Sequence, residues 1–331
     1  MTASSKGRVS SVERRSASDT RQKKVQGRIR WPGIASDFQR NKLLYLMALP
    51  IVGYYIVFFY WPMVGAVIAF QNFSPMKGIW GSEWVGLDHF YAFVNGHYFW
   101  RLLRNTLLLS AYSLLFEFTA PLLLALLINE VRSRLFRNVV QTVAYMPYFV
   151  SLIVVCGIVK DLTRSDGLVN LVYTFISGTD GQDMLQQPGL FRGVYVLSEI
   201  WQRAGWESII YMAALTAIDP KQYEAARIDG ASRLRQMWSI TLPGLAPTII
   251  IMLILRLGNM LEVGYEKIIL LYNPVTYETA DVISTFVYRK GLIDFDWSFS
   301  SAVGLFNSVI NLAILLFANA LSRRVSRNSL W

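Results

Sequence analysis

Charged residues are scarce in this chain of 331 residues: only 16% are Asp, Glu, Lys or Arg, against roughly 25% in an ordinary soluble domain. Hydrophobic residues make up 53% of the sequence. They gather in runs of about 20 residues, which is the length that an α-helix needs to cross a bilayer. The composition excludes an ordinary soluble protein and predicts an all-α polytopic membrane protein.

Cysteine and histidine are almost absent. The single cysteine, Cys156, has no second cysteine to pair with and lies in an apolar run, so we interpret it as a small packed hydrophobic residue. The two histidines, His89 and His97, form no metal-ligand pattern such as His-Glu-x-x-His, and no Gly-x-Ser-x-Gly nucleophile motif occurs. The sequence therefore predicts no metal site and no catalytic residue, and it disfavours a membrane enzyme.

A phosphate-binding loop of the form Gly-x4-Gly-Lys-Ser/Thr is also missing. If ATP drives the protein, the nucleotide and its Mg²⁺ must be bound by another polypeptide. We expect this chain to bind no cofactor of its own.

Six apolar segments are present that could span a membrane: residues 43–70, 105–128, 139–159, 193–217, 245–272 and 300–321. They define an expected transmembrane domain over residues 43–322. Residues 1–42 are rich in Ser, Lys and Arg and are expected to form a disordered tail, and residues 323–331 form a short basic tail.

The net charge of +10 is unevenly placed. With six spans, both termini, the 129–138 loop and the polar stretch 219–243 share one side, and most of the 32 lysines and arginines lie there. The positive-inside rule makes this side cytoplasmic, so we expect a multi-pass protein of the bacterial inner membrane. Topology and anionic lipids explain the basic excess without nucleic acid.

The polar stretch 219–243, called the elbow below, separates two predicted spans and carries strong helix-boundary signals. Asp219 is suited to cap a first helix, with Pro220 in its first turn, and Gly230 is free to adopt a positive φ just past its end. Ser232 is suited to cap a second helix that we expect to stop at Pro243. One face of that helix is apolar and carries Leu234, Met237 and Trp238.

The spacing within the elbow resembles a known signature. Glu-Ala-Ala at 224–226, Gly230, Ile240 and Leu-Pro at 242–243 resemble the EAA motif of permease subunits in bacterial binding-protein-dependent ABC importers. The form Glu-Ala-Ala-x-x-Asp-Gly-Ala is typical of sugar permeases, although Met237 stands where many carry Phe. The similarity covers residues 40–322, and the segments 70–75, 84–87, 272–274 and 301–306 are similar to the branch that imports oligosaccharides and polysaccharide fragments.

The resemblance implies a type I ABC-importer permease fold in which the elbow is a coupling helix docked on a cytoplasmic ATPase subunit. The implied partners are a second homologous permease, two ATPase subunits and an extracytoplasmic solute-binding protein. A loop that merely covers its own spans would explain the caps, but not the many small residues beside two acids. The expected coupling residues are Tyr223, Glu224, Ala225, Ala226, Asp229, Gly230, Ala231 and Pro243.

Polar residues inside the spans are candidates for a sugar path, because an ionisable group there should face a cavity or a partner. The candidates on the fourth span are Glu199, Gln202, Arg203 and Glu207, with Trp206 beside them, and those on the fifth are Arg256, Asn259, Glu262, Tyr265, Glu266 and Lys267. Asn259, Glu262 and Glu266 would share one face if the fifth span is a single helix, and the rings of Trp206 and Tyr265 would stack on sugars. The predicted path residues are Gln202, Gly205, Trp206, Arg256, Asn259, Glu262, Tyr265 and Glu266.

Internal ion pairs are an open alternative for these charges. Glu199 lies four residues before Arg203, and Glu262 or Glu266 would pair with Arg256 or Lys267 and only stabilise the bundle. Glu117 is interpreted as a polar group inside the bundle. A permease for another solute and a secondary transporter also remain alternatives, and activity without an ATPase would favour the latter.

Overall fold

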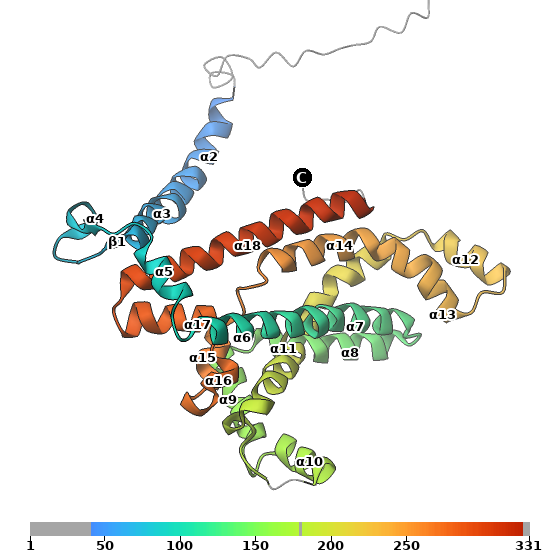
Figure 1. The fold of residues 1–331 in the computed structure, drawn as a ribbon. Coiled ribbons are helices and arrows are strands. Elements are labelled where there is room, and N and C mark those ends of the chain that lie inside the picture. Colours follow the sequence, from blue (N-terminus) through green and yellow to red (C-terminus); the bar gives the residue numbers. More distant parts are fainter. Residues whose placement is uncertain (1–40, 179–180, 327–331) are drawn as a thin grey trace, which may run out of the picture. The chain divides into compact units, whose positions relative to one another are not determined.

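The computed structural model describes residues 41–178 and 181–326, and the chain forms two compact units that divide between Met63 and Val64 (Figure 1). The predicted amino-terminal tail lies almost wholly outside the described residues, and so does the end of the carboxyl-terminal tail, residues 327–331. At the carboxyl end the last helix continues to Ser326, past the predicted boundary at residue 322.

The described part of the first unit is helical and carries exposed apolar side chains throughout. It contains α2 (Lys42–Tyr55), the π-helical turn η1 (Ile56–Tyr60) and α3 (Trp61–Met63). The helical run continues along the chain as far as Phe70 and is apolar enough to cross a membrane, which agrees with the first predicted span.

The second unit begins with a short segment that contains its only described sheet. This segment comprises η2 (Val64–Phe70), β1 (Gln71–Asn72), α4 (Gly78–Gly81), β2 (Glu83–Trp84) and α5 (Asp88–Val94). The two strands are antiparallel, with Gln71 opposite Trp84.

One continuous helical run contains the second predicted span. It consists of α6 (Phe99–Tyr112), the π-helical turn η3 (Ser113–Glu117) and α7 (Thr119–Glu130). A π turn widens the helix locally, and such turns often mark functional sites.

The third predicted span, residues 139–159, is wrong as a single helix. The chain instead forms α8 (Arg134–Tyr145) and the 3₁₀ turn η4 (Met146–Phe149), then bends by 104° into α9 (Leu152–Thr163) and α10 (Leu168–Ser177). The bend is stabilised locally because the Ser151 side chain accepts a hydrogen bond from the backbone N–H of Val154 and so caps α9.

The fourth predicted span, residues 193–217, forms part of α11 (Pro188–Thr216), except that Ala217 follows the helix as its C-cap. This helix of 29 residues follows the short turn η5 (Met184–Gln186). Four other helical runs in the described chain are long and apolar enough to cross a membrane, and the bent pair around residue 150 would make a fifth. α11 is not among these candidate spans by length and composition, and it carries the charged residues Glu199, Arg203 and Glu207 in its middle.

The elbow folds as two helical arms, α12 (Pro220–Ile228) and α13 (Arg233–Gln236). Asp219 and Ser232 cap them as predicted, and Gly230 has φ of 74°. The predicted stop at Pro243 is wrong, because α13 continues through the π turn η6 (Met237–Thr241) into α14 (Leu242–Gly258). In a regular α-helix the ring of Pro243 would clash with the backbone carbonyl four residues earlier. That carbonyl lies in the π turn η6, whose wider backbone differs from a regular α-helix.

The fifth predicted span, residues 245–272, is wrong as one helix. α14 ends at Gly258, a loop covers residues 259–264, and α15 (Tyr265–Leu271) follows. The chain then passes through the short helices η7 (Pro274–Thr276), α16 (Tyr277–Ala280), α17 (Ile283–Tyr288) and η8 (Arg289–Ile293) into the long α18 (Trp297–Ser326), which packs along α14 (Figure 1).

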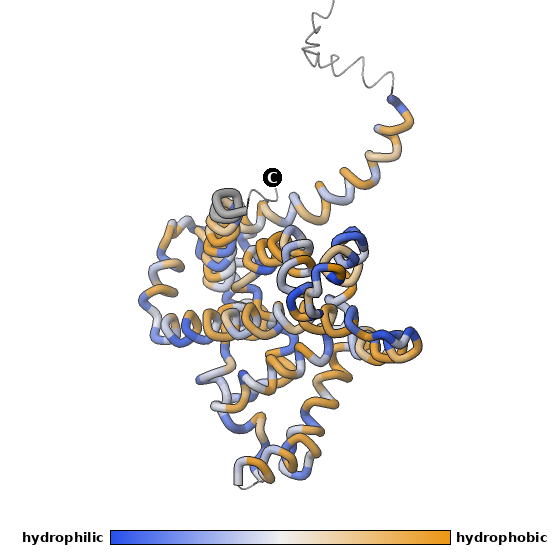
Figure 2. Tube along the Cα trace, turned by 90° about the vertical axis from the view of Figure 1, so that its right-hand side faces the viewer, coloured by the Kyte–Doolittle hydropathy of each residue, from blue (hydrophilic) through white to orange (hydrophobic). Residues whose placement is uncertain are grey.

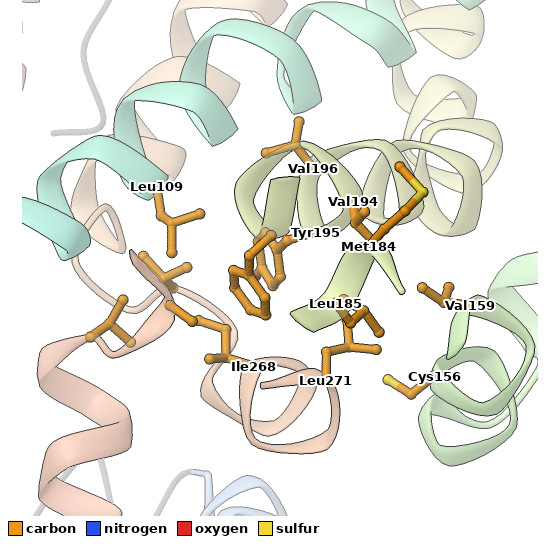
Figure 3. Packing of buried hydrophobic residues seen from close by; sticks show 14 of the residues in the cluster. Leu109, Cys156, Val159, Met184, Leu185, Val194, Tyr195, Val196, Ile268 and Leu271 are labelled. Atoms are coloured by element: carbon orange, nitrogen blue, oxygen red, sulfur yellow. The ribbon is translucent and has the colours of Figure 1, made fainter. Parts of the chain in front are cut away.

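The largest buried cluster gathers around α11, with contributions from α6, α9 and α15. Tyr195 lies at its centre beside Ile268 and Leu271, and Cys156 packs at its edge, 2% exposed, as a small hydrophobic residue (Figure 3). Many hydrophobic residues occur along the long helices (Figure 2), and a number of large apolar side chains are exposed, among them Leu127 on α7. Such a surface needs lipid or a partner chain rather than water.

Candidate functional site

A polar cavity of about 390 Å³ lies in the second unit between the α6–η3 run, α11, α14 and the loop that follows α14. Most of its polar groups come from helices, and Asn259 and Glu262 come from the loop. Its lining residues are Ser110, Ser113, Leu114, Glu117, Phe118, Tyr195, Glu199, Arg203, Glu207, Tyr211, Met252, Leu255, Arg256, Asn259, Met260, Glu262, Val263 and Gly264.

The loop after α14 forms one wall of this cavity and is fixed by side chains from two distant helices. The Ser110 hydroxyl on α6 donates to the carbonyl of Met260, and the Asn311 carbonyl oxygen on α18 accepts the backbone N–H of Leu261 at 3.0 Å. Irregular backbone at membrane depth is tolerated where it is buried in protein or lines a cavity. The broken helix is therefore consistent with a polar chamber inside the membrane.

Arg256 on α14 is paired across the cavity with the π turn η3. Its Nη2 donates to Glu117 and to the Ser113 hydroxyl, which itself donates to Glu117 at 2.6 Å. A second carboxylate, that of Glu207, lies 4.0 Å from Nη1 of the same guanidinium. Glu117 is buried in the bundle as predicted, and it also lines the cavity.

A second charged group surrounds Glu199 on α11. Lys267 donates to one carboxylate oxygen at 2.7 Å, and Nε of Arg203 lies 3.2 Å from the other. The predicted alternative of a Glu199–Arg203 pair is thus confirmed. The alternative pairing of Glu262 or Glu266 with Arg256 or Lys267 is not found among the described residues. Arg256 pairs with Glu117, and Lys267 pairs with Glu199.

Three of the eight predicted path residues line the cavity: Arg256, Asn259 and Glu262. The predicted face shared by Asn259, Glu262 and Glu266 is wrong, because the helix ends at Gly258 and the three residues lie on a loop and the next helix. Tyr265 and Glu266 are exposed in α15, outside the cavity lining.

The predicted path residues of α11 lie on another face of that helix. Gly205 meets the backbone of Ala144 in α8 so closely that no Cβ would fit there. Trp206 stacks on Tyr148 with ring centroids 4.7 Å apart, and Gln202 is buried one turn away from it. These three residues pack helices together.

The residues of α11 that do reach the cavity recur at intervals of four. Tyr195, Glu199, Arg203 and Glu207 form one stripe along the helix. Glu199, Arg203 and Glu207 were among the polar candidates of the fourth span, but the predicted path took Gln202, Gly205 and Trp206 instead. The i, i+4 repeat of polar groups was the sequence signal that would have chosen between the two faces.

The elbow presents an exposed surface on an anchored base. Of the predicted coupling residues, Glu224, Ala225, Asp229, Gly230 and Pro243 are exposed, and Tyr223, Ala226 and Ala231 are half-buried. The base is fixed by a hydrogen bond of 3.0 Å between the hydroxyls of Tyr223 and Thr241 and by an ion pair of 3.3 Å between Arg233 and Glu130 at the end of α7.

A further buried ionic cluster, which the sequence analysis missed, lies outside the candidate spans. The Asp281 side chain is fully buried and accepts hydrogen bonds from Arg289 at 2.6 and 2.8 Å and from Thr285 at 2.7 Å. Burial is the largest single influence on the pKa of the Arg289 guanidinium and would lower it, but the hydrogen bonds and charge attraction to Asp281, together with the contact with Tyr272, raise the pKa overall. An acid between Ala280 and Val282, in an otherwise apolar run, was the available signal.

Residues 117–327 match the family model described as the inner membrane component of binding-protein-dependent transport systems. The chain belongs to this family. It is therefore a permease, that is, a multi-pass transport subunit of an ABC system in the inner membrane and not the catalytic subunit. The resemblance found in the elbow motif is thereby confirmed.

Close relatives cover almost the whole chain. The polygalacturonan/rhamnogalacturonan transport system permease YteP of Bacillus subtilis (strain 168) is 45% identical over 293 residues, which are 88% of this chain and 91% of the relative. A crystal structure of a bacterial ABC transporter that imports the acidic polysaccharide alginate contains a chain with 47% identity and a TM-score of 0.81, covering 88% of this chain and 99% of that one.

A second crystal structure shows the alginate transporter in complex with its periplasmic protein, which carries an alginate pentasaccharide. The matching chain is 45% identical with a TM-score of 0.82, and the match covers 90% of this chain and 99% of that one.

Proposed function

We propose that this permease forms half of the membrane path of an ATP-driven importer for oligosaccharides or polysaccharide fragments, delivered by an extracytoplasmic binding protein. The substrates in the names of its relatives, polygalacturonan, rhamnogalacturonan and alginate, support a saccharide cargo. The complex of the alginate transporter with its loaded periplasmic protein supports delivery by a separate protein. A second, homologous permease would complete the path.

The polar cavity at the broken helix is the observation that carries this proposal. Its volume of about 390 Å³ falls within the range of ordinary small-ligand sites. Sugar hydroxyls both donate and accept hydrogen bonds, so they suit a lining of carboxylates, guanidinium groups and an amide. We assign Arg256, Asn259 and Glu262 to the path, together with Arg203 and Glu207 of α11, which were polar candidates of the fourth span.

The elbow is proposed to couple this cavity to two ATPase subunits, which hold the ATP and Mg²⁺. The helical run Arg233–Gly258 has 26 residues, about 39 Å at 1.5 Å per residue. It begins in the elbow and ends at the cavity loop, with Arg256 in its last turn. A displacement of the elbow would therefore reach the cavity through one continuous helix.

A six-span topology with cytoplasmic termini is also part of the proposal. The four apolar runs and the bent pair account for five spans. α11, at 29 residues and about 44 Å, is long enough to be the sixth. Three of its charges, Glu199, Arg203 and Glu207, border the cavity, so they need not meet lipid.

Uptake by the purified transporter tests the proposal. The permease is isolated with its partner subunits, reconstituted into proteoliposomes and supplied with binding protein loaded with each member of a panel of acidic and neutral oligosaccharides. Uptake should require ATP on the side of the ATPase subunits and loaded binding protein on the other. Saccharide uptake without ATP would instead identify a secondary transporter.

The coupling role of the elbow has its own test. Asp229→Arg and Gly230→Asp place a reversed or new charge on the exposed surface and should abolish both copurification of the ATPase and uptake, while the permease still inserts. Asp166→Arg is a matched control, since Asp166 is 72% exposed and lies far from the elbow in the sequence. Retained copurification and uptake in both elbow variants would refute the coupling role.

A further inference from the structure

The charges around the cavity are not evenly compensated. One carboxylate, that of Glu199, faces two cations, Lys267 and Arg203, so this group retains one positive charge in excess. Elsewhere in the lining, Arg256 faces the two carboxylates of Glu117 and Glu207. A ligand carboxylate is therefore attracted to the first group and repelled by the second.

We propose that Arg203 binds the carboxylate of an acidic sugar unit in the cavity and so makes the permease selective for uronate-containing saccharides over neutral ones. The proposal rests on the function proposed above and adds the class of sugar and the residue that recognises it.

Arg203 is the cation of the cavity that is free to accept a new partner. Lys267 is only 3% exposed and lies 2.7 Å from Glu199, so no ligand reaches it. The Arg256 side chain is 29% exposed, and its Nη2 is already occupied by Glu117 and Ser113. The Arg203 side chain is 48% exposed and reaches Glu199 through Nε alone, at 3.2 Å.

The geometry of Arg203 suits a carboxylate. Its Nε faces Glu199, and its two terminal nitrogens make no hydrogen bond to any described residue. Guanidinium groups bind carboxylates through paired, nearly parallel hydrogen bonds, which an ammonium group does not reproduce. Losing Arg203 would not leave Glu199 uncompensated, because Lys267 remains.

The other carboxylates of the cavity fix the orientation of the sugar. Glu207 lies one turn further along α11, and Glu262 projects from the loop after α14. Both accept hydrogen bonds from hydroxyl groups and repel a carboxylate. The acidic group of a sugar unit is thus placed at Arg203, with its hydroxyls toward Glu207 and Glu262.

The experiment compares one acidic oligosaccharide, the member of the panel that gives the fastest uptake, with its fully methyl-esterified form. Both are delivered by the same binding protein to the reconstituted transporter, so any change in their relative rates between variants comes from the permease. Arg203→Gln should reduce uptake of the acidic form about tenfold or more and change uptake of the ester less than about threefold. Arg203→Lys should fall between Arg203→Gln and the wild type.

Arg164→Gln is the control, because Arg164 is an exposed arginine that pairs with Asp166 outside the cavity, and its acid-to-ester ratio should match that of the wild type. Equal losses for the acid and the ester in Arg203→Gln, or no loss for either, would overturn the proposal. It would also fail if the wild type takes up only neutral oligosaccharides, an outcome that leaves the importer function intact. If no saccharide is taken up by the wild type, the proposed function itself fails.

Discussion

Breaking the Arg256–Glu117 pair should destabilise the permease by an amount that depends on which partner is removed. Arg256→Met leaves the Glu117 carboxylate, 7% exposed, with Ser113 as its remaining donor, and one of its oxygens already has no partner among the described residues. Removing one member of a buried pair costs about 3–5 kcal/mol. The partial exposure of Arg256, 29%, places the expected loss near the lower end, about 3 kcal/mol.

Glu117→Gln should cost less, about 1–2 kcal/mol, because Arg256 keeps Glu207 as a second carboxylate 4.0 Å away. The double variant leaves neither a buried carboxylate nor a cation at this position. Its loss should therefore be smaller than the sum of the single losses, by about 1–3 kcal/mol.

The wild type, the two single variants and the double variant form a double-mutant cycle. They are unfolded in mixed micelles of increasing dodecyl sulfate content, and unfolding is monitored by tryptophan fluorescence. The free energies of unfolding give the coupling between the two side chains. Additivity of the single losses to within about 0.5 kcal/mol would show that the two residues do not interact, and would refute the pairing across the cavity.

Substitutions at Gly205 and Asp281, with one at Gly193 as a control, test the packing of the second unit, each by the thermal midpoint of the purified permease. Gly205→Ala should lower the midpoint strongly, since its Cβ would overlap the carbonyl of Ala144 and overpacking costs about 1–3 kcal/mol, whereas Gly193→Ala, with open space around it in the same helix, should be neutral or stabilising. Equal midpoints for the two glycine variants would contradict the close approach of α11 and α8. Asp281→Asn should cost about 3 kcal/mol, because Arg289 loses its charged partner; an unchanged midpoint would show that this buried pair contributes nothing.

Local chemistry explains why the elbow was predictable. Asp219 and Ser232 cap helices that begin at the next residue, and Gly230 adopts the positive φ that its position requires. Each of these interactions joins residues a few positions apart, so the sequence contains both partners. The same holds for Ser151, whose cap begins α9, although its significance as a break in the third span was missed.

Distant contacts explain why the broken fifth span was not predictable. The break contains no proline, and the two glycines at its edges, Gly258 and Gly264, do not by themselves end a helix, so an apolar run of this length is normally read as one helix. The break is fixed by Ser110 and Asn311, which lie about 150 and 50 positions away in the sequence. Nothing within the fifth span itself indicates that these partners exist.

The sequence by itself determined the membrane character, the family and the residues of the elbow, because composition, hydrophobic length and short-range spacing are properties of the chain alone. The tertiary structure decided the cavity. The polar residues of the fourth and fifth spans could be nominated from the sequence, but only the packing of α11 against α8 and η4 turns Gly205 and Trp206 away and brings Glu199, Arg203 and Glu207 to the cavity. Which ions pair there depends on the rotation of packed helices, and that rotation is set by contacts between segments far apart in the sequence.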